Sequence, residues 1–164
     1  MQTSSARHAT PVLFRSPIAP SPRLAQACLW STCRETQFEA MQDAYRRSGG
    51  VVPAEELTAQ WSTPDAPSIS SLARWIVERQ VICFEREKQH WLPLFQFCPD
   101  TLSPRPEMVG VVQELSGALD PWELALWFVR PNAWLHGRAP VNATHDDLPS
   151  ILDAARASRF AVNG

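Results

Sequence analysis

The chain has 164 residues and a mass of 18.4 kDa, with 45% hydrophobic and 20% charged residues. This size suits one or two small globular domains, and the composition argues against wholesale disorder. No apolar run approaches the roughly 18 residues that a membrane span needs, and residues 1–23 lack the apolar core of a secretory signal. We therefore expect a soluble, cytoplasmic protein with no membrane partner.

Charge varies along the chain, although the formal net charge is only −2. Residues 1–50 carry six arginines against three acids, whereas residues 51–100 and 101–164 are both net acidic. The small net charge gives no global attraction to nucleic acid. Contact with DNA would therefore depend on local groups of cations.

The N-terminal part is predicted to be an arm followed by a long helix. Residues 1–22 are rich in proline and small polar residues, which is typical of a flexible arm. Residues 23–47 contain no Gly or Pro and carry apolar side chains at helical spacing, up to the glycines at 49 and 50. We expect this helical segment, residues 23–50, to pack on the domain or on a second copy of the chain, as in a homodimer.

Residues 51–98 are predicted to form a helix-turn-helix-like unit with a β-hairpin. Pro53 opens a short helix that reaches Trp61, and a proline-rich turn leads to Ser68, which caps a second helix. The core side of this second helix, which extends to about Gln80, is predicted to consist of Ile69, Leu72, Trp75 or Ala73, and Ile76.

The hairpin is indicated by two apolar segments, 81–84 and 90–97, on either side of the charged residues 85–89. Pro93 cannot donate a ladder hydrogen bond, so we expect it at a sheet edge or a bulge. The whole unit resembles a winged helix-turn-helix.

Residues 107–164 are predicted to form a C-terminal helical domain. Its first helix buries an apolar face ending at Leu115, and its second begins at Asp120-Pro121, with an N-cap followed by proline. A last helix runs from Leu148 to about Arg159, with Phe160 facing inward. The predicted fold class is mainly α, a winged helix-turn-helix-like unit with a small β-hairpin followed by this domain.

Residues that could carry out catalysis are few. The cysteines show no C-x-x-C spacing and are interpreted as reduced core residues, and the four histidines are scattered. No H-E-x-x-H, G-x-S-x-G or phosphate-binding glycine motif occurs. We therefore predict no catalytic residues, no metal, no cofactor and no enzymatic activity.

The stretch 127–141, WFVRPNAWLHGRAPV, followed by the helix LPSILDAA at 148–155, resembles the C-terminal toxin-binding domain of Xre/MbcA/ParS-type bacterial antitoxins. The shared pattern is an aromatic helix, P-N-x-x-L-x-G-x-x-P, a short spacer and a last helix. Residues 72–97 look like the helix and hairpin that often precede this domain. The resemblance implies an antitoxin that binds a cognate toxin, commonly a RES-domain enzyme, and represses its own operon.

Four residues on the motif are candidates for toxin binding: Arg130, Trp134, His136 and Arg138. Long polar and aromatic side chains on a turn are common in binding surfaces. The alternative is that they are solvated turn residues, while Leu135 fills the core and Gly137 provides a positive φ.

Four other residues are candidates for binding operator DNA: Arg74 and Arg79 on the second helix, and Arg86 and Lys88 on the hairpin. The alternative is that neighbouring acids pair with these cations. Two further functions stay open, a stand-alone DNA-binding transcriptional regulator and a non-enzymatic interaction module.

Overall fold

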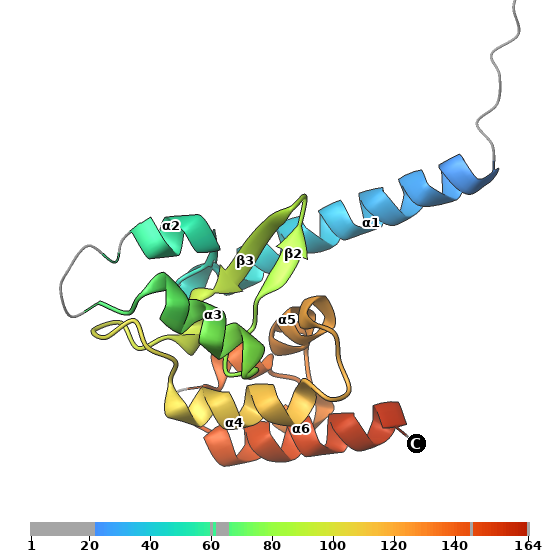
Figure 1. The fold of residues 1–164 in the computed structure, drawn as a ribbon. Helices are drawn as coiled ribbons and strands as arrows, with labels where there is room; N and C mark the ends of the chain where they lie inside the picture. The colour runs from blue at the N-terminus through green and yellow to red at the C-terminus, as the bar shows by residue number, and fades with distance from the viewer. Residues whose placement is uncertain (1–21, 60, 62–65, 145, 164) are drawn as a thin grey trace, which may run out of the picture. The chain divides into compact units, whose positions relative to one another are not determined.

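The computed structural model describes residues 22–59, 61, 66–144 and 146–163. The chain divides into two compact units, residues 1–35 and 36–164. The fold is mostly helical with a small three-stranded antiparallel sheet (Figure 1), which agrees with the predicted mainly α class. Apart from Pro22, the arm expected over residues 1–22 lies outside the described residues.

In chain order the elements are α1 (Pro22–Tyr45), η1 (Arg46–Ser48), β1 (Val51–Pro53), α2 (Ala54–Ala59), α3 (Ile69–Val77), β2 (Phe84–Arg86), β3 (Gln89–Pro93), η2 (Leu94–Gln96), α4 (Pro106–Leu115), α5 (Pro121–Val129), η3 (Ala133–Leu135), η4 (Pro140–Asn142) and α6 (Leu148–Asn163).

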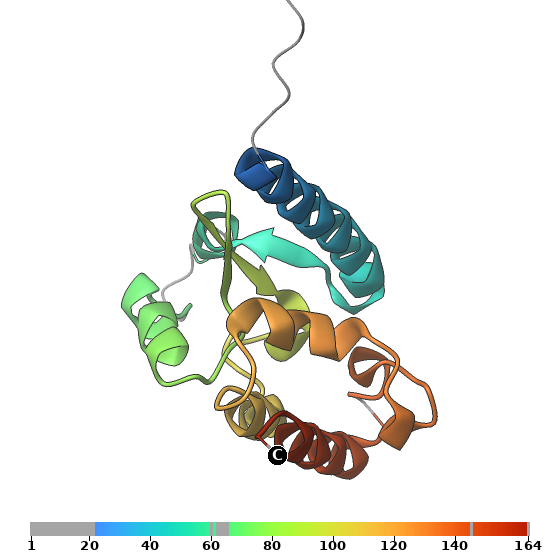
Figure 2. The same cartoon turned by 90° about the vertical axis from the view of Figure 1, so that its right-hand side faces the viewer.

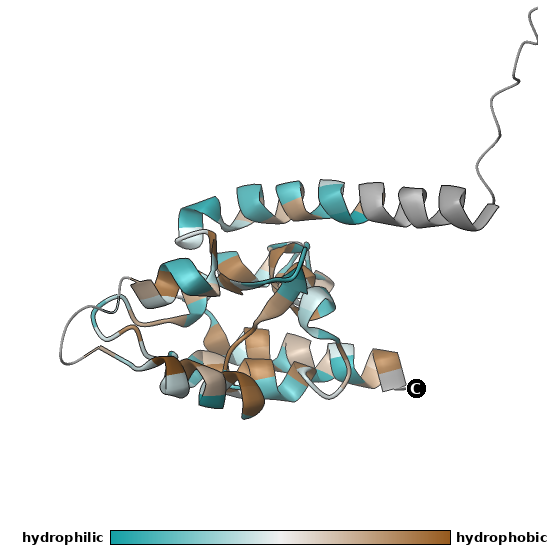
Figure 3. Cartoon of the chain, turned by 45° about the horizontal axis from the view of Figure 1, so that its top comes forward, coloured by the Kyte–Doolittle hydropathy of each residue, from teal (hydrophilic) through white to brown (hydrophobic). Residues whose placement is uncertain are grey.

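The last ten residues of α1 belong to the second unit and pack into its core through one face. Phe38, Met41 and Tyr45 are buried at spacings of three and four residues, as a helix requires. Most of the residues of α1 that Figure 3 colours are hydrophilic. Gly49, with φ 102°, follows the short η1 turn, so the predicted end of the helical segment at the glycines is confirmed.

The sheet has the strand order β1-β3-β2, and β1 was not predicted from the sequence. Its three residues are too short to show alternation. Pro93 was expected at an edge or bulge, and this is wrong because it is the last residue of the central strand, opposite Val51. The ladder continues past it, since the N–H of Leu94 donates to the carbonyl of Gly50 at 2.9 Å.

The predicted hairpin is confirmed, with a tighter turn than expected. Arg86 pairs with Gln89, so only Glu87 and Lys88 form the loop. Their φ values are 52° and 64°, the combination that a two-residue turn of type I′ requires. Glycine usually fills such positions, which is why the charged sequence did not reveal the turn's length.

A hydrophobic cluster lies on each face of the sheet. Trp91 of β3 faces the larger cluster together with Phe84, while its neighbour Leu92 faces a smaller cluster, as strand alternation dictates. The smaller cluster joins α2, α3 and the sheet through Leu57, Leu72, Trp75, Val81, Leu92 and Phe97. The larger one joins α1, α4, α5 and α6.

In α3 the predicted core side is correct only in part. Leu72 and Trp75 are buried, but Ile69 is 72% exposed and Ala73 is also exposed. The helix ends at Val77 rather than near Gln80, because Arg79 adopts the left-handed conformation with φ 54°. A helix this short presents only one narrow face to the core, which Leu72 and Trp75 occupy.

The C-terminal helices follow the predicted pattern closely. Asp120 caps α5 and forms a capping box with Glu123, and α4 and α6 lie side by side (Figures 1 and 2). Phe160 was expected inward, which is wrong because it is 70% exposed. The buried side of α6 follows Ile151 and Ala155, so Phe160 falls on another face. Across the described residues, no helix is long and apolar enough to cross a membrane.

Candidate functional site

The turn after α5 is held by a closed set of backbone and side-chain bonds around Asn132. Its Oδ1 accepts from the N–H of Trp134 at 2.9 Å, and its carbonyl accepts from Leu135 and Gly137 at 3.1 and 2.9 Å. Its own N–H donates to the carbonyl of Arg138 at 3.1 Å. Gly137 has φ 80°, and Leu135 is 1% exposed, so both structural roles predicted for the motif are confirmed.

This fixed turn holds Trp134 in solvent. Its side chain is 65% exposed, so most of this large, mainly apolar group faces solvent. Beside it lies a hollow of 360 Å³ between the end of α5, the turn and α6. Arg130 and Trp134 line it together with Leu119, Glu123, Trp127, Pro131, Asn132, Ala133 and Ser158.

The wall of this hollow is fixed by one hydrogen bond between α5 and α6. The indole Nε1 of Trp127 donates to Oγ of Ser158 at 2.9 Å, and the Ser158 hydroxyl in turn donates to the carbonyl of Ala154 at 2.9 Å. Trp127 therefore packs against the last helix. This contact between α5 and α6 holds one wall of the hollow in place.

The other two candidates lie outside the hollow. His136 is exposed and adopts the left-handed conformation with φ 55°. Arg138 is half-exposed, and its guanidinium lies 3.2 Å from the carboxylate of Asp146 and 3.4 Å from that of Asp147. These ion pairs connect the turn to the start of α6. The structure thus brings together two of the four predicted toxin-binding residues, Arg130 and Trp134.

The four DNA-binding candidates have different surroundings. Arg79 donates to the carbonyl of Ser116 at 2.9 Å. Arg86 lies over the ring of Phe38 at 4.4 Å from its centroid and pairs with Glu87 at 2.9 Å. Arg74 and Lys88 are exposed, and neither has a side-chain partner among the residues that the structure describes.

The surface of α3 beside Arg74 is apolar. Ile69, Ala73 and Val77 are exposed at intervals of four residues and so share one face of the helix. Val77 is 81% exposed. In both views the turn of the hairpin points away from α3 (Figures 1 and 2).

The sequence interpretation did not find the hollow. Leu119, Glu123, Trp127 and Ser158 were assigned no binding role, and Ser158 is 31 residues from Trp127. The exposed tryptophan was the only local signal. The remaining wall depends on how α6 docks, which no short motif encodes.

Two observations on the described residues concern metal binding and the reactivity of a cysteine. No group of three or more His, Cys, Asp or Glu side chains there could hold a metal ion. Burial raises the pKa of the Cys83 thiol to about 11, so this group is protonated at neutral pH and is a poor nucleophile.

Comparison with known proteins gives no match: no family model, no curated protein and no solved structure is similar to this chain.

Proposed function

We propose that this chain is an antitoxin-like protein that binds and neutralises a cognate toxin, of the RES type, through the surface around Trp134. The observation that carries the proposal is the 65% exposure of this indole on a turn whose backbone is fixed by Asn132. The resemblance of residues 127–141 to antitoxin domains supports the same surface. The resemblance alone supplies the identity of the toxin.

The chemistry of the surface suits protein recognition. Tryptophan and arginine are enriched among residues that dominate binding energy, and both line this hollow as Trp134 and Arg130. Leu119 and Trp127 give it apolar area, and Glu123 adds an acid for a cation of the partner. Because the turn is already ordered, binding costs little conformational entropy.

Neutralisation of this kind requires no reaction by the antitoxin. A complementary surface that loses its water on binding is sufficient to cover the active site of an enzyme. Trp134 provides an anchor that a partner can bury, and the adjoining hollow can accept a side chain from the partner. His136 and Arg138 belong to the rim of the same turn and are included in the proposed surface.

Operator binding is a second candidate function. Its support is the sequence of α2, α3 and a hairpin, the elements of a winged helix-turn-helix, with Arg74 on α3 and Lys88 on the hairpin turn. Both cations are exposed and without a side-chain partner within the described part of the chain. The apolar stripe of Ile69, Ala73 and Val77 instead favours the third class, an interaction module.

The antitoxin proposal is tested by growth. Each reading frame beside the gene is expressed alone and then together with the full chain. We expect one product to arrest growth and this chain to restore it. Trp134→Ala should abolish the rescue, whereas Phe160→Ala, which removes an exposed aromatic side chain outside the hollow, should preserve it. No arrest by either neighbour, or equal rescue by both variants, would overturn the proposal.

A further inference from the structure

A second cavity, of 600 Å³, lies between η1, η2 and the loop that leads to α4. Its walls are mostly apolar, with Leu57, Leu94, Phe95, Phe97 and Leu102 as the main contributors. It shares no lining residue with the hollow beside Trp134. Cavities of roughly 300–1,000 Å³ with apolar walls and a few polar groups are typical of small-molecule sites.

The rim of the cavity is built from backbone in unusual conformations. Leu102 has φ 52°, and the loop around it is closed by Leu102 N–H to Cys98 O and Cys98 N–H to Ser103 O, both at 2.8 Å. Gly49, which also lines the cavity, has φ 102°, and a Cβ there would lie 3.0 Å from Cβ of Leu94. Glycine adopts a positive φ without strain, whereas Leu102 is a strained position of the kind that is concentrated at ligand sites.

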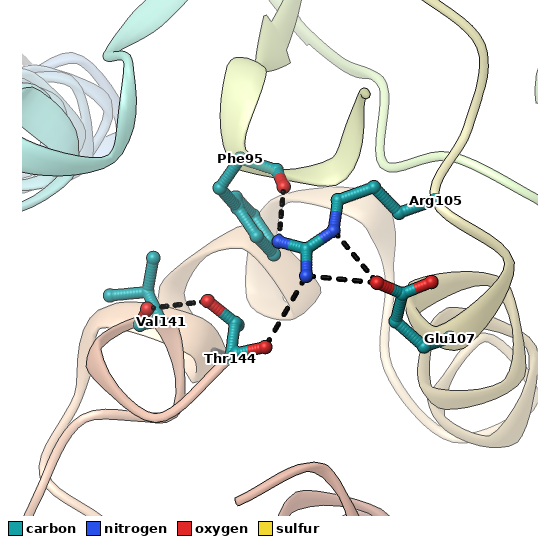
Figure 4. A network of polar contacts seen from close by, with 5 residues as sticks. All are labelled: Phe95, Arg105, Glu107, Val141 and Thr144. Atoms are coloured by element: carbon teal, nitrogen blue, oxygen red, sulfur yellow. Dashed lines mark hydrogen bonds and ion pairs between the residues drawn. The ribbon is translucent and has the colours of Figure 1, made fainter. Parts of the chain in front are cut away.

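The polar side chains of the wall differ in whether they already have hydrogen-bond or ion-pair partners within the protein. Ser48 donates to the carbonyl of Tyr45 at 2.9 Å. Arg105 pairs with Glu107 at 2.9 Å and donates to the carbonyls of Phe95 and Thr144 at 3.5 and 3.4 Å (Figure 4). The charge of Arg105 is therefore compensated inside the protein.

Arg47 is the exception in this wall. Its side chain is exposed at the cavity, and no hydrogen bond or ion pair joins it to any residue that the structure describes. An uncompensated guanidinium beside an apolar cavity suits a ligand with an anionic head and an apolar body, because a carboxylate accepts two parallel hydrogen bonds from it.

We propose that this cavity binds a medium-chain aliphatic carboxylate, with the carboxylate at Arg47 and the alkyl chain against Leu57, Leu94 and Phe97. This site is separate from the proposed toxin-binding surface, and its test is independent of that function. Burial of the chain provides affinity in proportion to its length, and the ion pair fixes its orientation.

The first experiment measures binding of octanoate, decanoate and 1-octanol to the full chain by isothermal titration calorimetry. Each additional CH₂ group should tighten Kd about fourfold while the cavity accommodates it. Octanol, which lacks the charge, should bind about tenfold more weakly than octanoate. No measurable binding of decanoate, or equal affinity for octanol and octanoate, would overturn the proposal.

The second experiment locates the site with a matched pair of variants. Arg47→Gln should weaken octanoate binding about tenfold. Arg46→Gln makes the same change of charge at the neighbouring residue, which does not line the cavity and pairs with Asp43, and should leave Kd unchanged. Equal effects of the two variants would show attraction by general charge and contradict the assignment.

A third measurement uses the unaltered protein and so does not depend on how a variant folds. Cys98 lines the cavity, whereas Cys33 is an exposed cysteine of the first unit. Decanoate should slow the alkylation of Cys98 by iodoacetamide and should not change the alkylation rate of Cys33. Peptide mass spectrometry measures both rates. Equal protection of both thiols, or of neither, would rule out binding in this cavity.

Discussion

The hydroxyl of Tyr45, at the end of α1, donates a hydrogen bond of 2.7 Å to the carbonyl oxygen of Ala125 in α5, 80 residues along the chain. Burial raises the pKa of this phenol well above its usual value, so the group keeps its proton and its donor role at neutral pH. The ring stacks on Phe95 at 5.5 Å between centroids. The contact thereby ties α1 and α5 to the segment between sheet and α4.

Tyr45→Phe should lower the free energy of unfolding by about 1 kcal/mol, because it keeps the ring and removes only the donor. Urea denaturation followed by circular dichroism measures this, and the m-value should stay constant. An unchanged midpoint would show that the hydrogen bond contributes nothing to stability.

Leu135 and Arg138 separate core from surface within one motif. Leu135→Ala should cost about 2–5 kcal/mol, since the side chain is 1% exposed and its removal leaves a cavity. Arg138→Ala should cost no more than about 1 kcal/mol, because its ion pairs with Asp146 and Asp147 are solvent-exposed. Thermal melts of both variants compare the two losses of stability. Equal losses would show that Arg138 is a structural residue.

Glu107 makes stability depend on pH. Its pKa is lowered chiefly by a hydrogen bond from its own backbone N–H and then by Arg105. A depressed folded-state pKa stabilises the protein above the usual glutamate pKa and loses this effect as the pH falls through the folded-state value. Glu107→Gln should therefore be less stable than the unaltered protein at pH 7 and equally stable at low pH. A stability difference independent of pH would contradict this.

DNA binding, if α3 and the hairpin provide it, depends on two exposed cations. Arg74→Ala and Lys88→Ala should each weaken binding to a DNA fragment from upstream of the gene and reduce the salt slope by about one unit. Arg156→Ala, an exposed arginine of α6 paired with Asp153, is the control and should change neither. Unchanged affinity and slope in both test variants would exclude this DNA surface.

Local sequence signals predicted the elements better than the way in which they pack. Asp120-Pro121 predicted the start of α5 because capping depends only on nearby residues, and Ser68 predicted that of α3 for the same reason. The predicted burial of Ile69 and Phe160 was wrong. Helical spacing shows which residues share a face, but it does not show which face packs against the core. Both are exposed, since core contacts of α3 and α6 use neighbouring positions.

The candidate site shows the same division. Trp134 and Arg130 were found because an aromatic and a cation on a turn are visible in the sequence. The burial of Leu135 likewise follows from the motif. The hollow itself requires Ser158 of α6 to meet Trp127 of α5, a contact set by tertiary packing. The cavity beside Arg47 likewise combines η1, α2 and the loop before α4, segments that no shared motif connects.

The central claim is that Trp134 anchors a toxin partner. The most direct test of this claim is the affinity of the full chain for the toxin that it neutralises in the growth experiment. Binding isotherms would compare the unaltered protein, Trp134→Ala and Phe160→Ala, each shown by circular dichroism to be folded. The account predicts that Trp134→Ala weakens binding by at least about thirtyfold, the effect of losing a residue that contributes 2 kcal/mol or more, while Phe160→Ala leaves Kd within about twofold. An unchanged Kd for Trp134→Ala would contradict the claim and move the partner to another face of the molecule.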